Sequence, residues 1–317
     1  MNGGKKFAAY AWTVLAYNLF VVVWGAFVRA TGSGAGCGSH WPLCNGDVVP
    51  RSPALATIIE FTHRATSGIA LVLVALLVFW AFRAYPKGHR VRLGAALSGL
   101  FLITEALIGA GLVLFEHVAK NASNARGFSL SIHLINTFTL VAVLALTGWW
   151  ASGAPGVTLR DPSKPRWLLG GTLAGMVVLG ISGAIAALGD TLFPASSLAA
   201  GVQQDLSGSA HIFVRLRVFH PAIAIAVTAL VLYVAMRGIK EWKLQRLGFV
   251  VMGLAFLQLM LGALNLGLLA PVWMQLIHLF AADLLWIATV LFSAAVLAGG
   301  PTGKHEAERH AVRSRTA

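Results

Sequence analysis

Two side chains able to do acid–base or metal chemistry lie close together in the stretch IIEFTHRATSG, residues 58–68. Glu60 lies three residues before His63, and residues three apart share one face of a helix. A long apolar segment follows, so both side chains would lie at a membrane boundary, where a carboxylate and an imidazole cost free energy to keep. A carboxylate beside a histidine can accept a proton or stabilise a developing cation. The stretch therefore indicates a reactive site.

Three more histidines lie near the starts of apolar segments. His133 and His278 occur in matching text, IHLINTFTLVAVLAL and IHLFAADLLWIATVL, and His220 occupies the place in the second half of the chain that His63 has in the first. The glycine pairs Gly25 and Gly183, and Gly109 and Gly262, align in the same way. This regularity predicts a duplication of a four-helix unit, whose two copies should have matching interiors.

Two histidines that face each other across a four-helix bundle can hold a haem iron from both sides, with the macrocycle in the apolar core. The repeat predicts two such sites, His63 with His133 and His220 with His278. His211 lies shortly before His220 and remains the alternative ligand in the second site. Haem propionates are anions, and four arginines at suitable depth are candidate partners for them or simple interface anchors: Arg29, Arg64, Arg215 and Arg217.

The two halves differ at the position three residues before the first histidine. Glu60 stands there in the first half and Arg217 in the second. A carboxylate can act as a base beside a haem, whereas an arginine cannot. This difference predicts chemistry in the first half and electron storage or transfer in the second. The alternative is that Glu60 is a residue favoured at a helix N-terminus by the helix dipole.

These residues must be positioned by membrane helices. The 317 residues are 57% hydrophobic and only 11% charged, which excludes a soluble globular domain. About 20 apolar residues span a lipid bilayer, and the sequence predicts an all-α polytopic membrane protein with eight spans forming two pseudo-symmetric four-helix bundles. The first span is expected to be retained rather than cleaved. The spans are approximately 8–29, 62–83, 93–115, 129–151, 167–189, 212–236, 247–269 and 273–298.

The net charge of +13 is explained by topology. Most of the 24 basic residues fall in the segments that are cytoplasmic if both termini are cytoplasmic, as the positive-inside rule expects for a multi-pass protein of the cell membrane. No nucleic-acid partner is needed. Cys37 and Cys44 then lie in an outer loop, where a disulfide bond is expected. Free thiols, or a metal site that includes His40, are the alternatives.

The expected organisation is an N-terminal four-helix half at 1–151, a cytoplasmic linker at 152–166, a C-terminal half at 167–299 and a cytoplasmic tail at 300–317. The linker SGAPGVTLRDPSKPR is rich in proline, glycine and charge, as expected of a boundary between units. A long outer loop is expected at 190–211. The sequence leaves the oligomeric state open.

The motifs GAFVRATGSGAGCGSHWPLCNG and IEFTHRATSG, with the later histidines, resemble the haem A synthases of bacteria and mitochondria over essentially the whole chain. The paired cysteines resemble the disulfide-bearing bacterial branch. The resemblance implies oxidation of a methyl group of haem O to a formyl group, giving haem A for terminal oxidases. It implies haem O at His63 and His133, with Glu60 catalytic, and a haem b cofactor at His220 and His278.

The resemblance also implies two partners, a haem O synthase and an electron acceptor. The sequence departs from the family pattern in two places: Gly38, Ser39 and His40 stand where many relatives have Pro–Asp, and Pro221 follows His220 where relatives often have arginine. Two other functions remain open. A di-haem b-type membrane electron carrier would leave Glu60 without a chemical role, and a transporter would use the histidines as proton relays.

Overall fold

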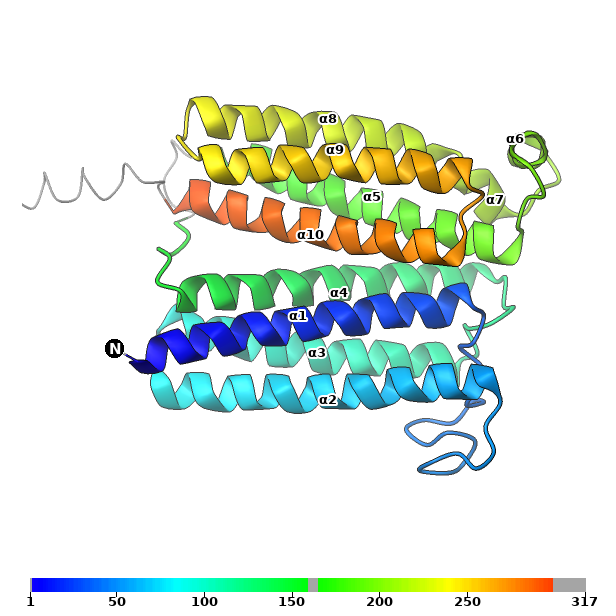
Figure 1. Ribbon diagram of the computed structural model, residues 1–317, viewed down its shortest axis with the longest axis horizontal. Coiled ribbons are helices and arrows are strands. Elements are labelled where there is room, and N and C mark those ends of the chain that lie inside the picture. The colour runs from blue at the N-terminus through cyan, green and yellow to red at the C-terminus, as the bar shows by residue number, and fades with distance from the viewer. Residues whose placement is uncertain (1, 159–164, 299–317) are drawn as a thin grey trace, which may run out of the picture.

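The structure is a computed structural model that describes residues 2–158 and 165–298. The tail at 300–317 and the middle of the linker lie outside the described residues. The described part of the chain forms helices joined by turns and loops (Figure 1), with one isolated bridge between Cys44 and Asp47. The helices are α1 Asn2–Ala30, α2 Leu55–Ala84, α3 Arg90–Leu114, α4 Asn124–Ala151, α5 Arg166–Leu192, α6 Leu198–Leu206, α7 Ile212–Arg217, α8 Phe219–Lys240, α9 Gln245–Gly267 and α10 Val272–Leu297.

Within the described residues, eight helical segments are long and apolar enough to cross a membrane, with α7 and α8 together forming one of them at Ile212–Lys240. Each of the eight overlaps a predicted span. The expected fold class, an all-α multi-pass membrane protein, is therefore confirmed. Many apolar side chains on the helices are exposed, as expected of surfaces that face lipid.

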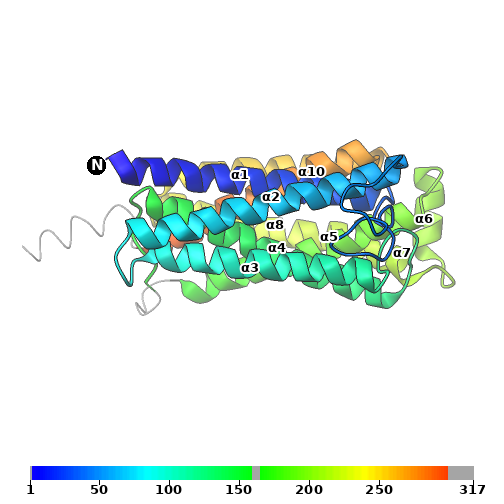
Figure 2. The same ribbon diagram turned by 90° about the horizontal axis from the view of Figure 1, so that it is seen from below.

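The eight long helices form two groups of four that lie side by side (Figures 1 and 2). In the first group α1 contacts α2 and α4, and α3 contacts the same two helices. In the second group α5 contacts α8, α8 contacts α9, and α9 contacts α10, which also contacts α5. The helices that carry the predicted ligands, α2 and α4 in one group and α8 and α10 in the other, occupy corresponding places.

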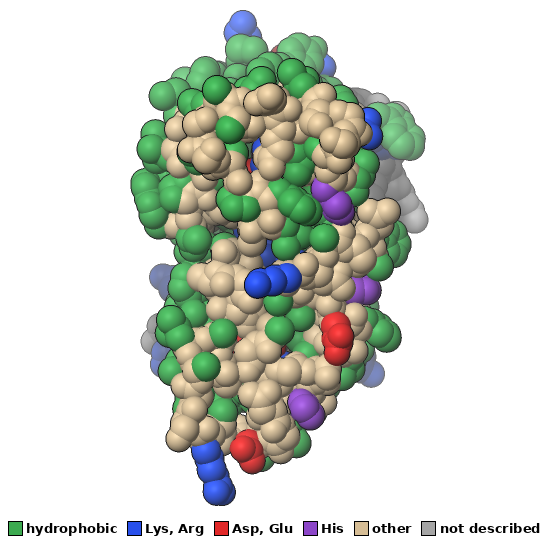
Figure 3. Space-filling view, turned by 90° about the vertical axis from the view of Figure 1, so that its right-hand side faces the viewer, with side chains coloured by type: hydrophobic (Ala, Val, Ile, Leu, Met, Phe, Trp, Pro, Cys, Tyr) green, Lys and Arg blue, Asp and Glu red, His purple; other side chains and the backbone are tan. Residues whose placement is uncertain are grey.

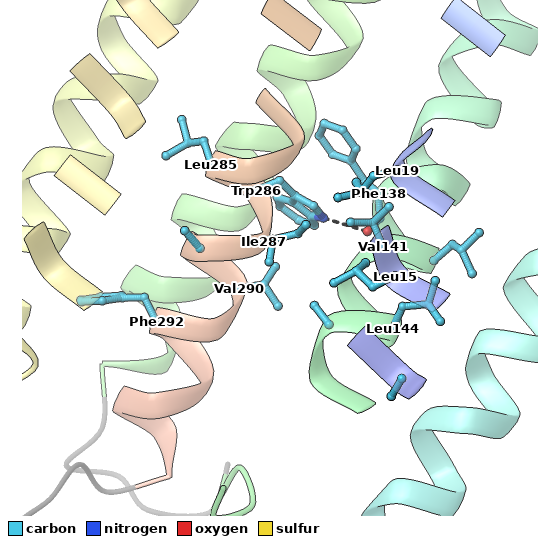
Figure 4. Packing of buried hydrophobic residues seen from close by; sticks show 14 of the residues in the cluster. Leu15, Leu19, Phe138, Val141, Leu144, Leu285, Trp286, Ile287, Val290 and Phe292 are labelled. Atoms are coloured by element: carbon cyan, nitrogen blue, oxygen red, sulfur yellow. Dashed lines mark hydrogen bonds between the residues drawn. The ribbon is translucent and has the colours of Figure 1, made fainter. Parts of the chain in front are cut away.

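The seam between the groups is formed mainly by α10 against α4 and α1, and by α4 against α5. Trp286 of α10 stacks on Phe138 of α4 with ring centroids 4.9 Å apart, and its indole N–H donates to the Phe138 carbonyl at 2.8 Å. Leu15 and Val141 complete the apolar contact (Figure 4). Van der Waals packing of these side chains and the interhelical hydrogen bond stabilise the seam, because apolar burial by itself gives little driving force between helices in lipid.

The sixth predicted span is interrupted. α7 ends at Arg217 and α8 begins at Phe219, with Val218 between them. Pro221 explains the break, because its ring lacks an N–H and clashes with the carbonyl four residues earlier, that of Arg217. The long loop predicted at 190–211 connects α5 to α7 and includes a short helix that the sequence did not predict. This helix is α6, whose N-terminus is capped by the Ser197 hydroxyl, which accepts from the Ala200 N–H at 3.1 Å.

Residues 31–54 and α6 lie at the same end of the molecule, called here the loop end (Figure 2). Seen from this end, charged and histidine side chains are scattered over a largely polar face, and apolar side chains cover the flanks (Figure 3). The segments α2, α4, α7–α8 and α10 all begin here. The four predicted ligands lie within three helical turns of these starts, roughly 9–14 Å into the bundle.

Candidate functional site

In the first group of helices, each predicted ligand lies against a glycine of the preceding helix. A Cβ added to Gly25 of α1 would lie 3.0 Å from Cε1 of His63 on α2. A Cβ on Gly109 of α3 would lie 3.8 Å from Cε1 of His133 on α4. The first distance leaves no room for a side chain and the second is ordinary contact. Glycine thus lets the His63 ring approach the α1 backbone closely.

The second group repeats this arrangement. A Cβ on Gly183 of α5 would lie 3.0 Å from Cε1 of His220, and one on Gly262 of α9 would lie 3.1 Å from Cε1 of His278. Both distances are tighter than ordinary contact. The glycines that align in sequence therefore meet the histidines that align in sequence, four times in one chain. Such a repeated close approach indicates that the ring positions are fixed by the helix packing.

The histidine rings come together in pairs. His63 on α2 and His133 on α4 belong to helices that both contact α1 and α3, and His220 on α8 and His278 on α10 belong to helices that both contact α5 and α9. Each pair joins two helices of one group. These are the partners that bis-histidine ligation requires.

The environment of the rings fits a haem iron. Nδ1 of His63, His133 and His278 is buried without a hydrogen-bond partner among the described residues. Nδ1 of His220 lies 2.9 Å from the Ser182 hydroxyl. A buried nitrogen without a partner is uncommon in proteins, and iron coordination requires ring nitrogens that the protein leaves available. The pairing and the orphaned nitrogens together make these residues suitable for haem.

Glu60 is almost completely buried, and both carboxylate oxygens accept hydrogen bonds at the loop end. One accepts from the Cys37 backbone N–H at 2.8 Å and the other from Arg64 at 2.5 Å. Arg64 also donates to the carbonyls of His40 and Leu43, each at 2.7 Å. Glu60 and Arg64 therefore fasten the loop at 31–54 to the start of α2. No direct contact joins Glu60 to His63 among the hydrogen bonds and ion pairs of the described residues.

The predicted disulfide is confirmed. Cys37 and Cys44 are bonded, with Cα atoms 4.4 Å apart, and both are buried. The alternatives of free thiols and of a metal site with His40 are thereby excluded. Among the described residues, no cluster of three or more histidine, cysteine or acidic side chains could hold a metal ion. The bridge lies directly beside the Glu60 contact, so it shapes the loop that covers α2.

In the second group, Arg217 holds a segment of the loop end in place, as Glu60 does in the first. Its guanidinium donates to Asp205 at 2.6 Å, to Asp190 at 3.0 Å and to Gln204 at 3.0 Å. These partners lie on α5 and α6. Arg217 therefore fastens the helix α6 to the end of the bundle, as Glu60 fastens the loop at 31–54.

The other two arginines differ in their surroundings. Arg29 reaches from α1 into the second group, where it donates to the Ala187 carbonyl at 2.9 Å, to Thr191 at 3.0 Å and to Gln275 at 2.9 Å. Arg215 is exposed, and its guanidinium has no hydrogen bond or ion pair with any described residue. Of the four candidate propionate partners, only Arg215 has its donors uncommitted in the described part of the chain.

His211 is engaged in a structural contact. Its Nδ1 accepts from the Phe213 N–H at 3.3 Å, which caps α7, and its ring stacks on Phe193 with centroids 4.8 Å apart. His220 instead faces the interior glycine of α5. The geometry therefore favours His220 over His211 as a ligand.

One acidic residue was not assigned a role from the sequence. Glu105 of α3 lies 3.6 Å from Nε2 of His133 through one carboxylate oxygen. The Asn136 amide donates to its other oxygen at 2.5 Å, and the Thr137 hydroxyl donates to the first. A signal was present in the sequence, because Glu105 lies one turn before Gly109 on the helix face that meets α4.

Comparison with known proteins identifies the family. The COX15-CtaA family, described as cytochrome oxidase assembly protein, matches residues 8–290. The chain belongs to this family. The predicted resemblance to the haem A synthases is thus confirmed.

Relatives within the family match unequal parts of this chain. A protein of Thermus thermophilus named protoheme IX farnesyltransferase is 47% identical over 304 residues, which is 93% of this chain and 49% of the relative. Heme A synthases of Halalkalibacterium halodurans and Geobacillus kaustophilus are 40% and 41% identical over 127 and 148 residues. These matches cover 40% and 46% of this chain, and 42% and 44% of those relatives. The chain thus spans about half the length of the curated relatives that it matches.

Proposed function

We propose that this protein oxidises a methyl group of haem O to a formyl group, producing haem A in the cell membrane, with both termini in the cytoplasm. The observation that carries the proposal is the fourfold arrangement of paired, partly buried imidazoles, each lying on a glycine of a neighbouring helix. Membership in the haem A synthase family supplies the class of reaction, which is an oxidation.

The two halves have different tasks in this proposal. His63 and His133 hold the substrate haem O, and His220 and His278 hold haem b. The division is supported by the groups beside the rings, because Glu105 lies beside His133 in the first group of helices and Gln258 lies beside His278 in the second. A bound haem b would supply one-electron transfer, which an oxidation needs in order to pass electrons on.

The protein residues supply binding and orientation. The glycines set how deeply the rings lie, and the apolar walls of the bundle exclude water from the macrocycle. Arg215 is the arginine that can reach toward an anionic propionate without giving up an existing contact. Glu60, held by Arg64 and the Cys37 N–H one helical turn before His63, is placed in this proposal to stabilise developing positive charge.

Two partners follow from the chemistry. Conversion of the methyl group to a formyl group takes the oxygen atom from water and releases four protons and four electrons, so haem O must be delivered and the electrons must reach an acceptor. The Thermus relative that bears the name protoheme IX farnesyltransferase contains a segment similar to nearly all of this chain within a protein about twice as long. That arrangement supports a haem O synthase as the partner that supplies the substrate through the lipid bilayer.

Replacing Glu60 with Gln tests the proposal. Glu60→Gln keeps a side chain that can contact Cys37 and Arg64 but removes the charge. The 317-residue chain, supplied with haem O and an electron acceptor, should then retain bound haem and make at least tenfold less haem A, measured by extraction and mass analysis. Glu116→Gln removes an exposed carboxylate at the same end and should leave haem A production unchanged. Absence of haem A from the unmodified protein under the same conditions would contradict the proposal.

A second function, a di-haem b electron carrier, is favoured by one observation. Both oxygens of Glu60 are already used to fasten the loop, which is a structural role. In a carrier, Glu60→Gln would leave electron transfer unchanged and haem O would leave the protein unmodified. The product analysis above separates the two functions directly.

A further inference from the structure

A polar network lies beside His133 in the interior of the first group of helices. Glu105 of α3 is its centre, with Asn136 and Thr137 of α4 both donating to the carboxylate. Asn136 is itself held, since its amide donates to the Phe101 carbonyl at 2.8 Å and its oxygen accepts from Thr104 at 2.6 Å. The carboxylate is thereby fixed in one position.

The corresponding positions in the second group lack this network. The matching text LITEALIG and AFLQLMLG places Gln258 where Glu105 stands, and Leu257 where Thr104 stands. In the same way, IHLINTF and IHLFAAD place Ala281 and Ala282 where Asn136 and Thr137 stand. The duplication has thus kept a hydrogen-bonding side chain one turn before the glycine in both halves. Only the first half carries a carboxylate there and the groups that fix it.

Gln258 also meets its histidine. Its amide nitrogen lies 3.3 Å from Nε2 of His278, and its amide oxygen is buried without a partner. Amide nitrogen and oxygen are assigned from the surrounding contacts rather than observed directly. Turning the amide over would place its oxygen against the ring nitrogen, where it would accept from an imidazole N–H. With the amide turned in this way, both halves would set an acceptor beside the ring, one anionic and one neutral.

We infer that Glu105 is a positioning residue for the first haem site, acting through His133; the inference rests on the proposed function, in which His133 binds the substrate haem. A histidine that binds a metal through one ring nitrogen donates the N–H of the other to an acceptor, which fixes the ring and raises its basicity. A carboxylate does this more strongly than an amide, because it carries a full negative charge.

The consequence is a difference between the two sites. A more basic ligand stabilises ferric iron relative to ferrous iron, so a haem held by His133 should have a lower reduction potential with Glu105 than with glutamine. Gln258 gives His278 a weaker acceptor, which leaves the second haem easier to reduce. The order of the two potentials then favours movement of electrons from the first site to the second.

The test uses two reciprocal exchanges, Glu105→Gln and Gln258→Glu, in the full chain loaded with iron protoporphyrin IX. Redox titration followed by optical spectra reports the midpoint potential of each site, and titration with the porphyrin reports affinity. Glu105→Gln should raise the potential of the first site and weaken its affinity about tenfold, as loss of such a partner typically does. Gln258→Glu should lower the potential of the second site.

Controls separate this inference from the proposed function. Glu116→Gln, at an exposed carboxylate, should move neither potential. His133→Ala should remove haem from the first site. If haem binding survives His133→Ala unchanged, the proposed site is wrong. If His133→Ala removes the haem but neither reciprocal exchange shifts a potential, the role given to Glu105 is wrong and the proposed function stands.

Discussion

The two groups of helices fasten their loops with side chains of opposite charge at corresponding positions. In the first group the buried Glu60 carboxylate accepts from Cys37 and Arg64, and in the second the Arg217 guanidinium donates to Asp190 and Asp205. Each side chain matches the charge of its partners: a loop N–H and an arginine of α2 in one case, carboxylates of α5 and α6 in the other. In both halves, the residue three positions before the first histidine therefore holds a neighbouring segment in place. Its charge differs between the halves, and so does the charge of its partners.

This comparison changes how the charge difference is interpreted. A carboxylate at position 60 and an arginine at position 217 do not by themselves mark one half as catalytic, because both side chains have a structural task. The difference between Glu105 and Gln258 is of another kind. Both lie beside a predicted ligand ring, and neither fastens a loop. Functional asymmetry is thus expected at the rings more than at the loop anchors.

The largest effect among variants of the anchors is expected for Arg217→Ala. It would leave Asp190 and Asp205 without their guanidinium partner. We expect about 2–3 kcal/mol of local destabilisation, less than the ~3–5 kcal/mol of a fully buried pair, because the Asp190 side chain is 30% exposed. Hydrogen exchange in detergent should show α6 losing protection.

Arg215→Ala provides the matched control for the Arg217 variant. The same residue type is removed two positions earlier in α7, but its guanidinium has no partner among the described residues. Protection of α6 should be unchanged. Equal loss of protection in both variants would show that α6 depends on overall positive charge rather than on the contacts of Arg217.

A smaller, graded effect is expected at the glycines. Alanine at Gly25 or Gly183 would place its Cβ 3.0 Å from an imidazole carbon, whereas alanine at Gly109 would place it at 3.8 Å. Forcing an extra methyl group into a packed interior costs about 1–3 kcal/mol. Thermal unfolding should show Gly25→Ala and Gly183→Ala destabilised, with a shifted haem spectrum, and Gly109→Ala close to the unmodified protein. A uniform response at all three positions would mean that helix propensity, and not the ring contact, decides the outcome.

The smallest effect is expected at the seam that joins the two groups. Trp286→Phe keeps an aromatic ring against Phe138 but removes the hydrogen bond to its carbonyl. Loss of one such bond costs about 1 kcal/mol. The melting temperature should fall slightly, and the haem spectra of both halves should stay unchanged. A large spectral change in either half would show that the seam controls the geometry of the ligands.

Several features could be predicted from the sequence because they depend on local patterns. The length of the apolar segments identified the eight spans. The expected position of Cys37 and Cys44 outside the cytoplasm identified the disulfide bond between them. The aligned histidines and glycines were visible as a repeat. The sequence did not show that each glycine contacts a histidine. This contact depends on how two helices face each other rather than on residue spacing within either helix.

The remaining features depend on contacts between distant segments. Glu60 accepts a hydrogen bond from a backbone N–H in the loop. Nearly every residue has a backbone N–H, so the sequence does not indicate which one will be the donor. The partners of Glu105 lie on the next helix, more than 30 residues away, so its spacing before Gly109 could place it on the same helix face but could not show that it faces His133. α6 was missed because a nine-residue helix in a polar loop has little apolar periodicity, and Ser197 as its cap was the main signal.

The central claim is that each group of helices holds one haem between its own pair of histidines. The most direct test is titration of the full chain with iron protoporphyrin IX in three forms: unmodified, His63→Ala with His133→Ala, and His220→Ala with His278→Ala. The account predicts two haems per chain in the first form and one in each of the others, with a low-spin spectrum of the surviving site. Loss of both haems from either double variant, or no loss from one of them, would contradict it.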